Sequence, residues 1–388
     1  MAGESYTPIE MIEKLVAFDT TSRNSNLDLI DFVAAYLDGH GIAVTRSFDD
    51  DRRKANLFAS LGPDKPGGVV LSGHTDVVPV DGQSWDSDPF TVAARGQRLY
   101  GRGVADMKSF IAIALALAPE FVAAGLESPL HFALSYDEEV GCIGVDRMIA
   151  GIKAAGLAPE IVIVGEPTGM KVANAHKGIY SFTTEVTGFE AHSSATHRGV
   201  NAVMIAADLI AFLSAQAAEM RLRGDPDSGF DPPYTSVHVG TVEGGTALNI
   251  IPARCGFQWE YRLMPEADPR EIIEAFEAYA TSLIPAMRAV AEGAGISTET
   301  RAQVPGLVAE DASPAERLVM ALTGDNRAIK VSYGTEAGKF QEAGASTVIC
   351  GPGHIDQAHK ANEFIDLAQV EACEAFMRRL MERLQSPL

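Results

Sequence analysis

Histidine and carboxylate side chains occur at five places in the chain, each close behind an apolar segment or within a glycine-rich loop. They are His74, Asp76, Asp106, Asp137, Glu138, Glu139, Glu166, His354 and His359. Imidazole nitrogens and carboxylate oxygens are the ligands that zinc and related divalent ions take in proteins. Taken singly, each place has an ordinary alternative, such as a helix cap or a solvated acidic loop. Together, the five places predict a metal-dependent enzyme.

The segment 72–79 places His74 and Asp76 two residues apart, directly after the apolar run 68–72. Side chains two residues apart project from the same side of an extended chain. A metal-bound histidine needs its second ring nitrogen oriented by an oxygen, so His74 as ligand and Asp76 as its support are chemically consistent. A buried histidine that is hydrogen-bonded to a turn aspartate explains this motif equally well.

Asp106 lies in the glycine-rich segment 100–108, ahead of a predicted apolar helix. The glycines permit backbone angles and close approaches that can aim Asp106 at a strand end. A phosphate-binding loop is disfavoured, because the P-loop spacing and the Ser or Thr after the lysine are missing. Asp106 as a helix N-cap is the ordinary alternative.

Asp137, Glu138 and Glu139 follow the predicted strand that begins at Leu130, and Glu166 follows the apolar segment 161–164. Three adjacent carboxylates repel one another, and a bound cation is one way to stabilise them. In a metal site one glutamate would be a ligand and its neighbour the general base beside the attacking water. The segment 350–363 adds His354 and His359, of which only one is needed as a ligand.

The elements that must position these residues alternate between helix-like and strand-like patterns up to about residue 178. This alternation predicts an α/β fold with a large parallel component, in which ligands bind at the carboxyl ends of the strands. Beyond it, the order strand, helix, strand, strand, helix, with a final strand near 296–300, predicts a ferredoxin-like layer. The expected organisation is two domains: a catalytic domain over 1–178 and 294–388, and an inserted domain over 179–293.

Composition limits the partners and the location. The chain has 388 residues and a formal net charge of −21, which argues against a nucleic-acid partner, because phosphate binding needs clustered Lys and Arg. The four cysteines are scattered, with no CxxC pair. Residues 1–10 lack the pattern of a signal peptide, and the longest apolar stretch, 110–119, is too short to span a bilayer. We therefore expect a cytoplasmic protein that binds no membrane.

These motifs resemble those of the M20 family of metallopeptidases and deacylases, over nearly the whole chain. The resemblance rests on SGHTDVVP (72–79), GRGVADMK (101–108), DEEVG (137–141), GEPT (165–168), GTEAG (334–338) and CGPGHIDQAH (350–359). It implies a zinc aminopeptidase-like catalytic domain, with a mixed, mostly parallel sheet covered by helices on both faces. It also implies that the inserted βαββαβ domain is a lid and dimerisation domain, so that the protein is a homodimer.

The resemblance also implies roles for the site residues. His74 and Glu166 would hold one metal ion and Glu139 and His359 a second, with Asp106 bridging them. Asp76 would be the supporting carboxylate and Glu138 the general base. The two divalent ions are expected to be Zn²⁺, although such His and carboxylate sites also accept Co²⁺ or Mn²⁺. His354 matches no ligand position of the family.

The resemblance extends to the lid and the substrate. His192 would reach the partner subunit's active site and stabilise the oxyanion, while Asn249, Arg262, Thr335 and Glu336 would contact substrate. A salt bridge is the ordinary alternative for Arg262, a turn for Asn249 and helix capping for Glu336. The expected reaction is hydrolysis of an N-acyl amino acid, with N2-acetyl-L-ornithine favoured, because GTEAG and GPGHIDQAH are more similar to the acetylornithine branch than to the succinyl-diaminopimelate branch. A carboxypeptidase or dipeptidase, or another deacylase, would use the same cluster. An inactive binding protein on this fold is disfavoured, because all the proposed ligands and the base are present.

Overall fold

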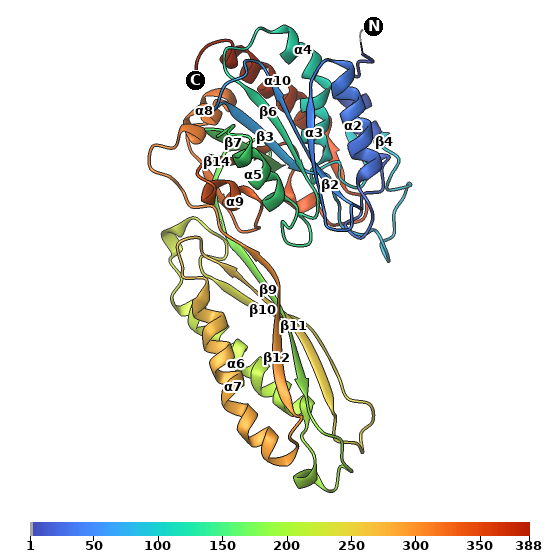
Figure 1. Ribbon diagram of the computed structural model, residues 1–388, viewed down its shortest axis with the longest axis vertical. Coiled ribbons are helices and arrows are strands. Elements are labelled where there is room, and N and C mark those ends of the chain that lie inside the picture. The colour runs from blue at the N-terminus through green and yellow to red at the C-terminus, as the bar shows by residue number, and fades with distance from the viewer. Residues whose placement is uncertain (1–2) are drawn as a thin grey trace. The chain divides into compact units, whose positions relative to one another are not determined.

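The computed structural model describes residues 3–388, and these residues form two compact units (Figure 1). Unit 1 comprises the described residues up to Ala175 together with Leu307–Lys330 and Thr335–Leu388. Unit 2 comprises His176–Gly306 and Val331–Gly334. The second unit is therefore inserted into the first, as the sequence predicts.

Unit 1 is built on a large mixed sheet of eight strands. Their order in the sheet is β1-β2-β6-β3-β7-β14-β8-β13. These strands are β1 (Val44–Phe48), β2 (Ala55–Leu61), β3 (Val69–His74), β6 (Leu130–Ser135), β7 (Ile161–Pro167), β8 (Ala173–His176), β13 (Ile329–Val331) and β14 (Ser346–Gly351). The four central strands β6, β3, β7 and β14 are parallel to their neighbours within that group. Their carboxyl ends therefore meet at one edge of the sheet, where α/β proteins bind ligands.

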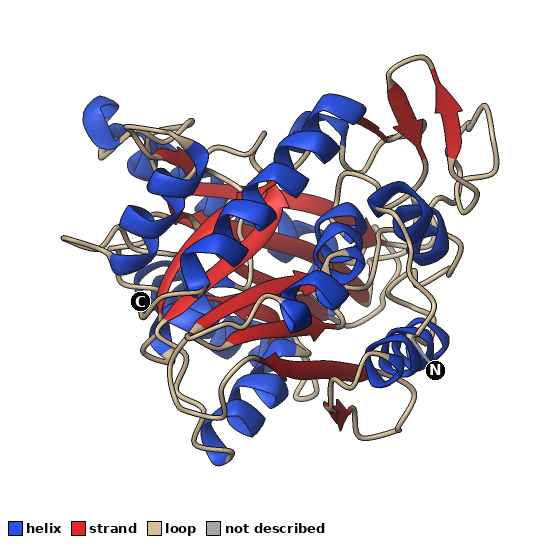
Figure 2. Cartoon of the chain, turned by 90° about the horizontal axis from the view of Figure 1, so that it is seen from above, coloured by secondary structure: helices blue, strands red, loops and turns tan. Residues whose placement is uncertain are grey.

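The central strands are almost continuously apolar because both faces of the sheet are covered by helices (Figure 2). The helices are α1 (Pro8–Val16), α2 (Leu27–Gly39), α3 (Lys108–Ala116), α4 (Ala118–Ala123), α5 (Val145–Ala154), α8 (Pro314–Thr323), α9 (Ala337–Glu342) and α10 (Leu367–Leu384). Residues of α1, α2, α3, α8 and α10 share one core cluster with the strands. A separate small sheet has the order β15-β5-β4 and comprises β4 (Ala93–Arg95), β5 (Arg98–Tyr100) and β15 (Phe364–Asp366).

Unit 2 has the predicted βαββαβ order. Its elements are β9 (Gly178–Thr187), α6 (Ala202–Leu222), β10 (Ser236–Gly244), β11 (Arg254–Leu263), α7 (Arg270–Val290) and β12 (Gly295–Val304). The strands form an antiparallel sheet in the order β10-β11-β9-β12, which is the ferredoxin-like arrangement. Phe182, Phe257 and Trp259 from this sheet and Phe276 from α7 form its core.

Two sequence-based boundaries need correction. The predicted end of the inserted domain at residue 293 falls before β12, which hydrogen-bonds along β9 from Gly295 to Val304 and thus belongs to unit 2. Five of the ten residues of β12 are exposed, and the strand pattern near 296–300 does not show to which domain the strand belongs. The apolar helix predicted after the glycine-rich segment 100–108 is instead two helices, α3 followed by α4, with Pro119 in the first turn of α4.

Helix α6 is long and apolar enough to qualify as a candidate membrane span, with a mean hydropathy of 1.5 over its best window. One such helix is weak evidence for a membrane protein, because helices of soluble domains pass the same test. Ala206, Leu209 and Leu213 of α6 pack into the core of unit 2. The packing role accounts for part of its apolar character.

Candidate metal centre

The seven residues predicted to form and support the metal cluster come together in unit 1, at the carboxyl edge of the parallel strands. His74 is the last residue of β3, and the acidic turn 137–139 follows β6. Glu166 lies at the end of β7, and His359 lies in the loop after β14. Asp106 precedes α3, and its peptide bond to Met107 is cis. Parallel pairing thus brings together residues that are separated by up to 285 positions in the sequence, from 74 to 359.

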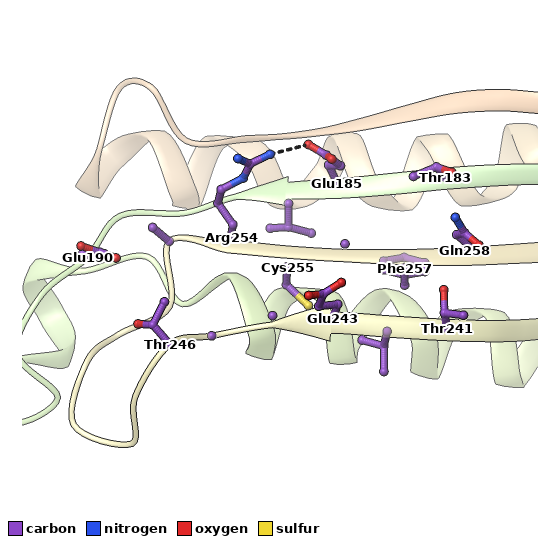
Figure 3. A pocket seen from close by; sticks show the side chains of 16 residues that line it. Thr183, Glu185, Glu190, Thr241, Glu243, Thr246, Arg254, Cys255, Phe257 and Gln258 are labelled. Carbon is purple, nitrogen blue, oxygen red and sulfur yellow. Dashed lines mark hydrogen bonds and ion pairs between the residues drawn. The ribbon is translucent and has the colours of Figure 1, made fainter. Parts of the chain in front are cut away.

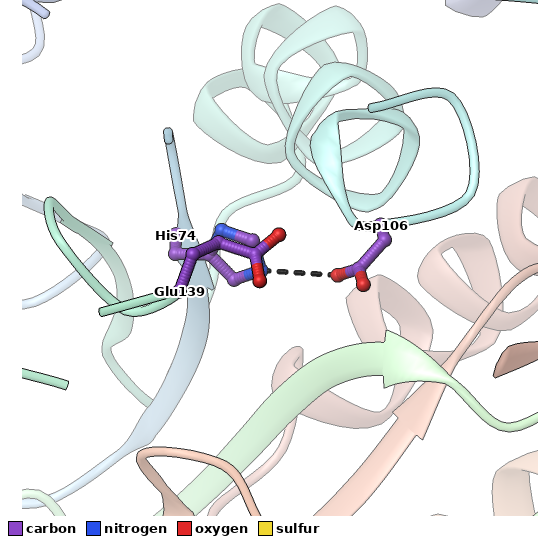
Figure 4. Close-up of side chains that lie close together, drawn as sticks. All are labelled: His74, Asp106 and Glu139. Atoms are coloured by element: carbon purple, nitrogen blue, oxygen red, sulfur yellow. Dashed lines mark hydrogen bonds and ion pairs between the residues drawn. The ribbon is translucent and has the colours of Figure 1, made fainter. Parts of the chain in front are cut away.

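Asp106 contacts both histidines, one through each carboxylate oxygen. Its Oδ1 lies 3.1 Å from Nε2 of His74, and its Oδ2 lies 3.3 Å from Nε2 of His359. Figure 4 shows the contact between His74 and Asp106, with Glu139 beside His74. Glu166 Oε1 lies 3.5 Å from His74 Nε2, while Glu139 Oε2 lies 3.1 Å from His359 Nε2. The atoms therefore fall into two groups that share Asp106.

The tautomer of His74 suits metal binding. Its Nδ1 lies 2.9 Å from the backbone carbonyl oxygen of Asp76, which can only accept a hydrogen bond. Nδ1 therefore carries a proton, and Nε2, which faces Asp106 and Glu166, is the nitrogen that can bind a metal ion. The predicted support of His74 by Asp76 thus acts through the backbone carbonyl, since the Asp76 carboxylate lies farther away, at 3.6 Å.

The Asp76 carboxylate organises the acidic turn. It accepts hydrogen bonds from the backbone N–H groups of Glu138 (3.1 Å) and Glu139 (3.2 Å). It also accepts one from the Ser22 hydroxyl (2.7 Å), and Lys54 joins the Ser22 carbonyl to the Asp137 carboxylate. Sequence reasoning missed Ser22 and Lys54, because neither belongs to a motif and both come from segments distant from the cluster.

Two buried carboxylate oxygens in the cluster, Glu139 Oε1 and Glu166 Oε1, accept no hydrogen bond within residues 3–388. A buried carboxylate oxygen without a partner is costly, and a coordinated cation supplies such a partner. Ligand atoms of His74, Asp106 and Glu139 lie within 4.8 Å of one another, as a metal site requires. The residues therefore fit a bound divalent cation.

Charge repulsion in the metal-free cluster is visible in its pKa values. Burial and the neighbouring Asp106 carboxylate raise the pKa of Glu139 to about 7. Burial and the charge of Asp106 also raise the pKa of Glu166 well above its usual range. Hydrogen bonds to Asp106 and Glu139 raise the pKa of His359 to about 10. The cluster thus retains protons that a divalent cation would replace.

Glu138 also comes within ligand range, because its oxygen, a His74 nitrogen and a Glu166 oxygen lie within 4.8 Å of one another. Proximity alone does not separate the base from the ligands. The Cys142 thiol donates to Glu138 Oε1 at 3.3 Å. In the metal-free cluster, burial, followed by repulsion from Glu139 and Asp106, raises the pKa of Glu138 to about 8.

The GTEAG residues do not occupy the expected substrate position. Glu336 is 1% exposed, and both of its carboxylate oxygens accept hydrogen bonds, from Ser72 (2.6 Å) on β3 and from Ser135 (2.7 Å) on β6. Its side chain caps no helix either. Thr335 is fully buried and accepts the Ala337 N–H (3.0 Å). Glu336 therefore connects the two strands that carry His74 and the acidic turn, because a buried carboxylate must find donors.

The predicted lid residues lie in unit 2. His192 is exposed, and its Nδ1 accepts the backbone N–H of Ser194 (3.2 Å), so the proton of the neutral ring is on Nε2. Asn249 is also exposed. It lies next to this loop, because its backbone carbonyl accepts the N–H of Ser193 (3.1 Å). Arg262 forms two hydrogen bonds to Glu260, both 3.1 Å, so the salt bridge considered as its alternative role is present.

His354 is separate from the cluster contacts described above. It is exposed and precedes the short helix Ile355–Gln357, where its backbone N–H donates to the Gln357 side chain (3.2 Å). Unit 2 also has a hollow of about 840 Å³ along β9, β10 and β11 (Figure 3). It is lined by polar residues such as Thr183, Glu185 and Gln258, and it contains none of the predicted ligands.

A family model described as peptidase family M20/M25/M40 matches residues 70–383. The chain is 36% identical to the acetylornithine deacetylase of Myxococcus xanthus over 381 residues, which cover 95% of each protein.

Solved structures share the fold. An M20 family metallo-carboxypeptidase from Sulfolobus solfataricus aligns with a TM-score of 0.76 at 15% identity, over 97% of this chain and 99% of that one. A Bacillus subtilis protein described as a dinuclear metal-binding peptidase of family M20 aligns with a TM-score of 0.60 at 16% identity, over 96% of both chains.

Proposed function

The chain belongs to peptidase family M20/M25/M40, and from that premise we propose that it removes the acyl group from an N-acyl amino acid, with N2-acetyl-L-ornithine as substrate. The products would be L-ornithine and acetate. The observation that carries the proposal is the position of Asp106, which presents one carboxylate oxygen to His74 and the other to His359. Glu139 and Glu166, each with a buried oxygen that accepts no hydrogen bond from the described residues, complete the set.

Metal-dependent amide hydrolysis is the activity of this class of enzyme. We propose that His74 and Glu166 hold one divalent ion, that Glu139 and His359 hold the other, and that Asp106 bridges them. When bound, such ions polarise the scissile carbonyl and make a water molecule acidic enough to attack near neutral pH. Zn²⁺ is the proposed ion, and Co²⁺ or Mn²⁺ suit the same ligands.

Glu138 would transfer the protons. It accepts a proton from the attacking water and returns it to the leaving amine, which requires a carboxylate that ionises near the working pH. Its place beside the proposed ligands, within 4.8 Å of atoms of His74 and Glu166, and its hydrogen bond from Cys142 support that role. The ligands Glu139 and Glu166 are unsuited to it, because their free oxygens would be occupied by metal.

His192 would stabilise the oxyanion. Because Ser194 donates to its Nδ1, the ring presents an Nε2–H donor to solvent on unit 2. We propose that this donor serves the active site of a second copy, in a homodimer formed through unit 2. Exposed apolar residues support such an interface: Met204 on α6 is 66% exposed, and Leu248, next to Asn249, is fully exposed.

The substrate assignment rests on the 36% identity to an acetylornithine deacetylase, which extends over 95% of both chains. Asn249 and Arg262 are proposed to contact the substrate, whereas Glu336 is not, because its carboxylate is buried and occupied. The test is a panel of N2-acetyl-L-ornithine, N-succinyl-diaminopimelate, N-acetylmethionine and a dipeptide, with release of free amine as the readout. The proposal expects the highest kcat/KM for N2-acetyl-L-ornithine, and a higher value for any other member would overturn it.

A further inference from the structure

A buried ion pair lies beside the metal centre and is used by none of the steps above. Arg102 and Glu363 are each 1% exposed, and Nη1 of Arg102 lies 2.7 Å from Oε2 of Glu363. A buried pair is stable only when further hydrogen bonds satisfy the remaining donors and acceptors. The hydrogen bonds that satisfy this pair connect it to two proposed metal ligands, Asp106 and His359.

The first connection runs to Asp106. The other oxygen of Glu363, Oε1, accepts the backbone N–H groups of Ala105 (2.8 Å) and Asp106 (3.2 Å). One carboxylate thus holds the peptide units on the N-terminal side of the bridging ligand. Residue 363 lies only four positions after His359, so the same segment carries a ligand and the group that fixes another ligand.

The second connection runs to His359. Nη2 of Arg102 donates to Oε1 of Gln83 (2.7 Å), and Nε2 of Gln83 donates to the backbone carbonyl of His359 (2.9 Å). The Trp85 indole also donates to Gln83 Oε1 (3.1 Å), which fixes the orientation of the amide. Gln83 therefore connects the ion pair to the ligand loop.

His359 needs such support more than the other ligands do. Its side chain is 53% exposed, whereas the side chains of His74 and Glu166 are 1% and 5% exposed at the ends of strands. Its backbone has a φ of 61°, which is an uncommon conformation for a residue other than glycine. Neither burial nor regular secondary structure holds this loop residue in place.

We propose that Gln83, Arg102 and Glu363 form a positioning network that fixes His359 relative to Asp106. Through Gln83 the network would set the affinity of the metal position that includes His359. The position of His74 and Glu166 lacks His359, so Gln83 would not act on it. This inference rests on the proposed metal cluster. Gln83 is the residue to test, because it is only partly buried and its removal leaves the contact between Arg102 and Glu363 in place.

The experiment is a calorimetric titration of metal-free protein with Zn²⁺, comparing wild type, Gln83→Ala and Gln83→Glu. Glutamate keeps the acceptor for Arg102 but loses the donor to His359, so both variants should weaken one of two binding events by about tenfold or more. The other event should be unchanged. Arg98→Ala is the matched control, since Arg98 pairs with Asp366 at 2.9 Å across β5 and β15, close to Arg102 and Glu363 in the chain but at the surface. The control should bind both ions as wild type does.

A second pair of variants identifies the ligand through which Gln83 acts. In a His359→Ala background, Gln83→Ala should have no further effect on the remaining binding event, because the two changes remove one interaction. Equal weakening of both events, no weakening, or an added effect in the His359→Ala background would overturn the inference. If the wild-type protein binds no divalent ion, the proposed function fails. If it binds two ions and the Gln83 variants bind both with unchanged affinity, only this inference fails.

Discussion

The carboxylates of the cluster have different tasks, and the difference lies in what each oxygen contacts. The two oxygens of Asp106 contact the two histidines, and Glu138 accepts a hydrogen bond from a thiol. Within residues 3–388, Glu139 and Glu166 each have a buried oxygen that accepts no hydrogen bond. Sequence reasoning identified these residues because their types and motifs are local information. The contacts that distinguish their tasks depend on Ser22, Lys54, Cys142 and Glu363, whose roles arise only when the chain folds.

Replacing Glu138 with Gln tests the base. The amide keeps the size of the side chain but cannot accept a proton from water, so turnover should fall by about 10²- to 10⁴-fold. Metal content should stay at the wild-type value, because the proposed ligands are untouched. Steady-state kinetics with elemental analysis of the same sample checks both. Near-normal turnover, or loss of an ion, would show that Glu138 is not the base.

Replacing Glu139 with Gln tests charge repulsion in the metal-free cluster. Burial raises the pKa of Glu139 from 4.5 to about 7, so in the absence of metal its ionisation destabilises the fold. That group's contribution to stability is present below pH 4.5 and is lost as the pH rises through about 7. At about 1.4 kcal/mol for each pH unit between the two values, the loss reaches at most about 3 kcal/mol.

In urea unfolding with a metal chelator present, the Glu139→Gln substitution should therefore raise the free energy of unfolding at pH 8 and change it little at pH 5. With Zn²⁺ present the order at pH 8 should reverse, because the variant lacks a ligand and gains less from binding. If the wild-type protein is more stable than the Glu139→Gln variant at pH 8 in the presence of chelator, the raised pKa of Glu139 is contradicted.

At the scale of elements, the parallel strands β3, β6, β7 and β14 deliver ligands to one edge. The hydrophobic pattern predicted this arrangement, because parallel strands covered on both faces are almost entirely apolar. It did not predict where unit 2 ends, because the strand pattern near 296–300 does not reveal that this strand pairs with β9. The burial of Glu336 could not be predicted either, because Ser72 and Ser135 are 264 and 201 positions away from it in the sequence.

Glu336→Leu tests whether that residue supports the strands or contacts substrate. Removing the carboxylate leaves two buried hydroxyls without their acceptor, which should lower the unfolding free energy by roughly 1–3 kcal/mol. KM should change alike for cationic and neutral N-acyl amino acids. Glu342→Gln, an exposed change on the same helix α9, is the control. Unchanged stability with a KM that rises only for N2-acetyl-L-ornithine would instead indicate a substrate contact.

At the scale of the whole molecule, the ligands and the proposed oxyanion donor lie in different units. Unit 1 contains the metal ligands and Glu138, whereas unit 2 contains His192, Asn249 and Arg262. The two-unit architecture follows from the sequence pattern. Which copy of unit 2 serves which active site depends on assembly, and no pattern within one chain contains that information.

Mixed dimers test the assembly. His192→Ala and Glu138→Gln chains should each be nearly inactive alone. A mixture exchanged into heterodimers should regain up to about a quarter of the wild-type turnover, because half of the dimers are mixed and each would have one active site with both groups intact. Activity of the mixture is compared with that of each parent at equal concentration. Absence of any recovery, in heterodimers verified by differential tags, would rule out a His192 contribution across subunits.

The central claim is that a pair of divalent ions in unit 1 hydrolyses an N-acyl amino acid. The most direct measurement is a stepwise Zn²⁺ titration of chelator-treated protein, following acetate release from N2-acetyl-L-ornithine and the bound metal in the same samples. We expect no activity without metal, recovery as the ion is added, and saturation of binding at two ions per chain. Activity that persists in the chelated protein, or a chain that binds fewer than one ion, would contradict the claim.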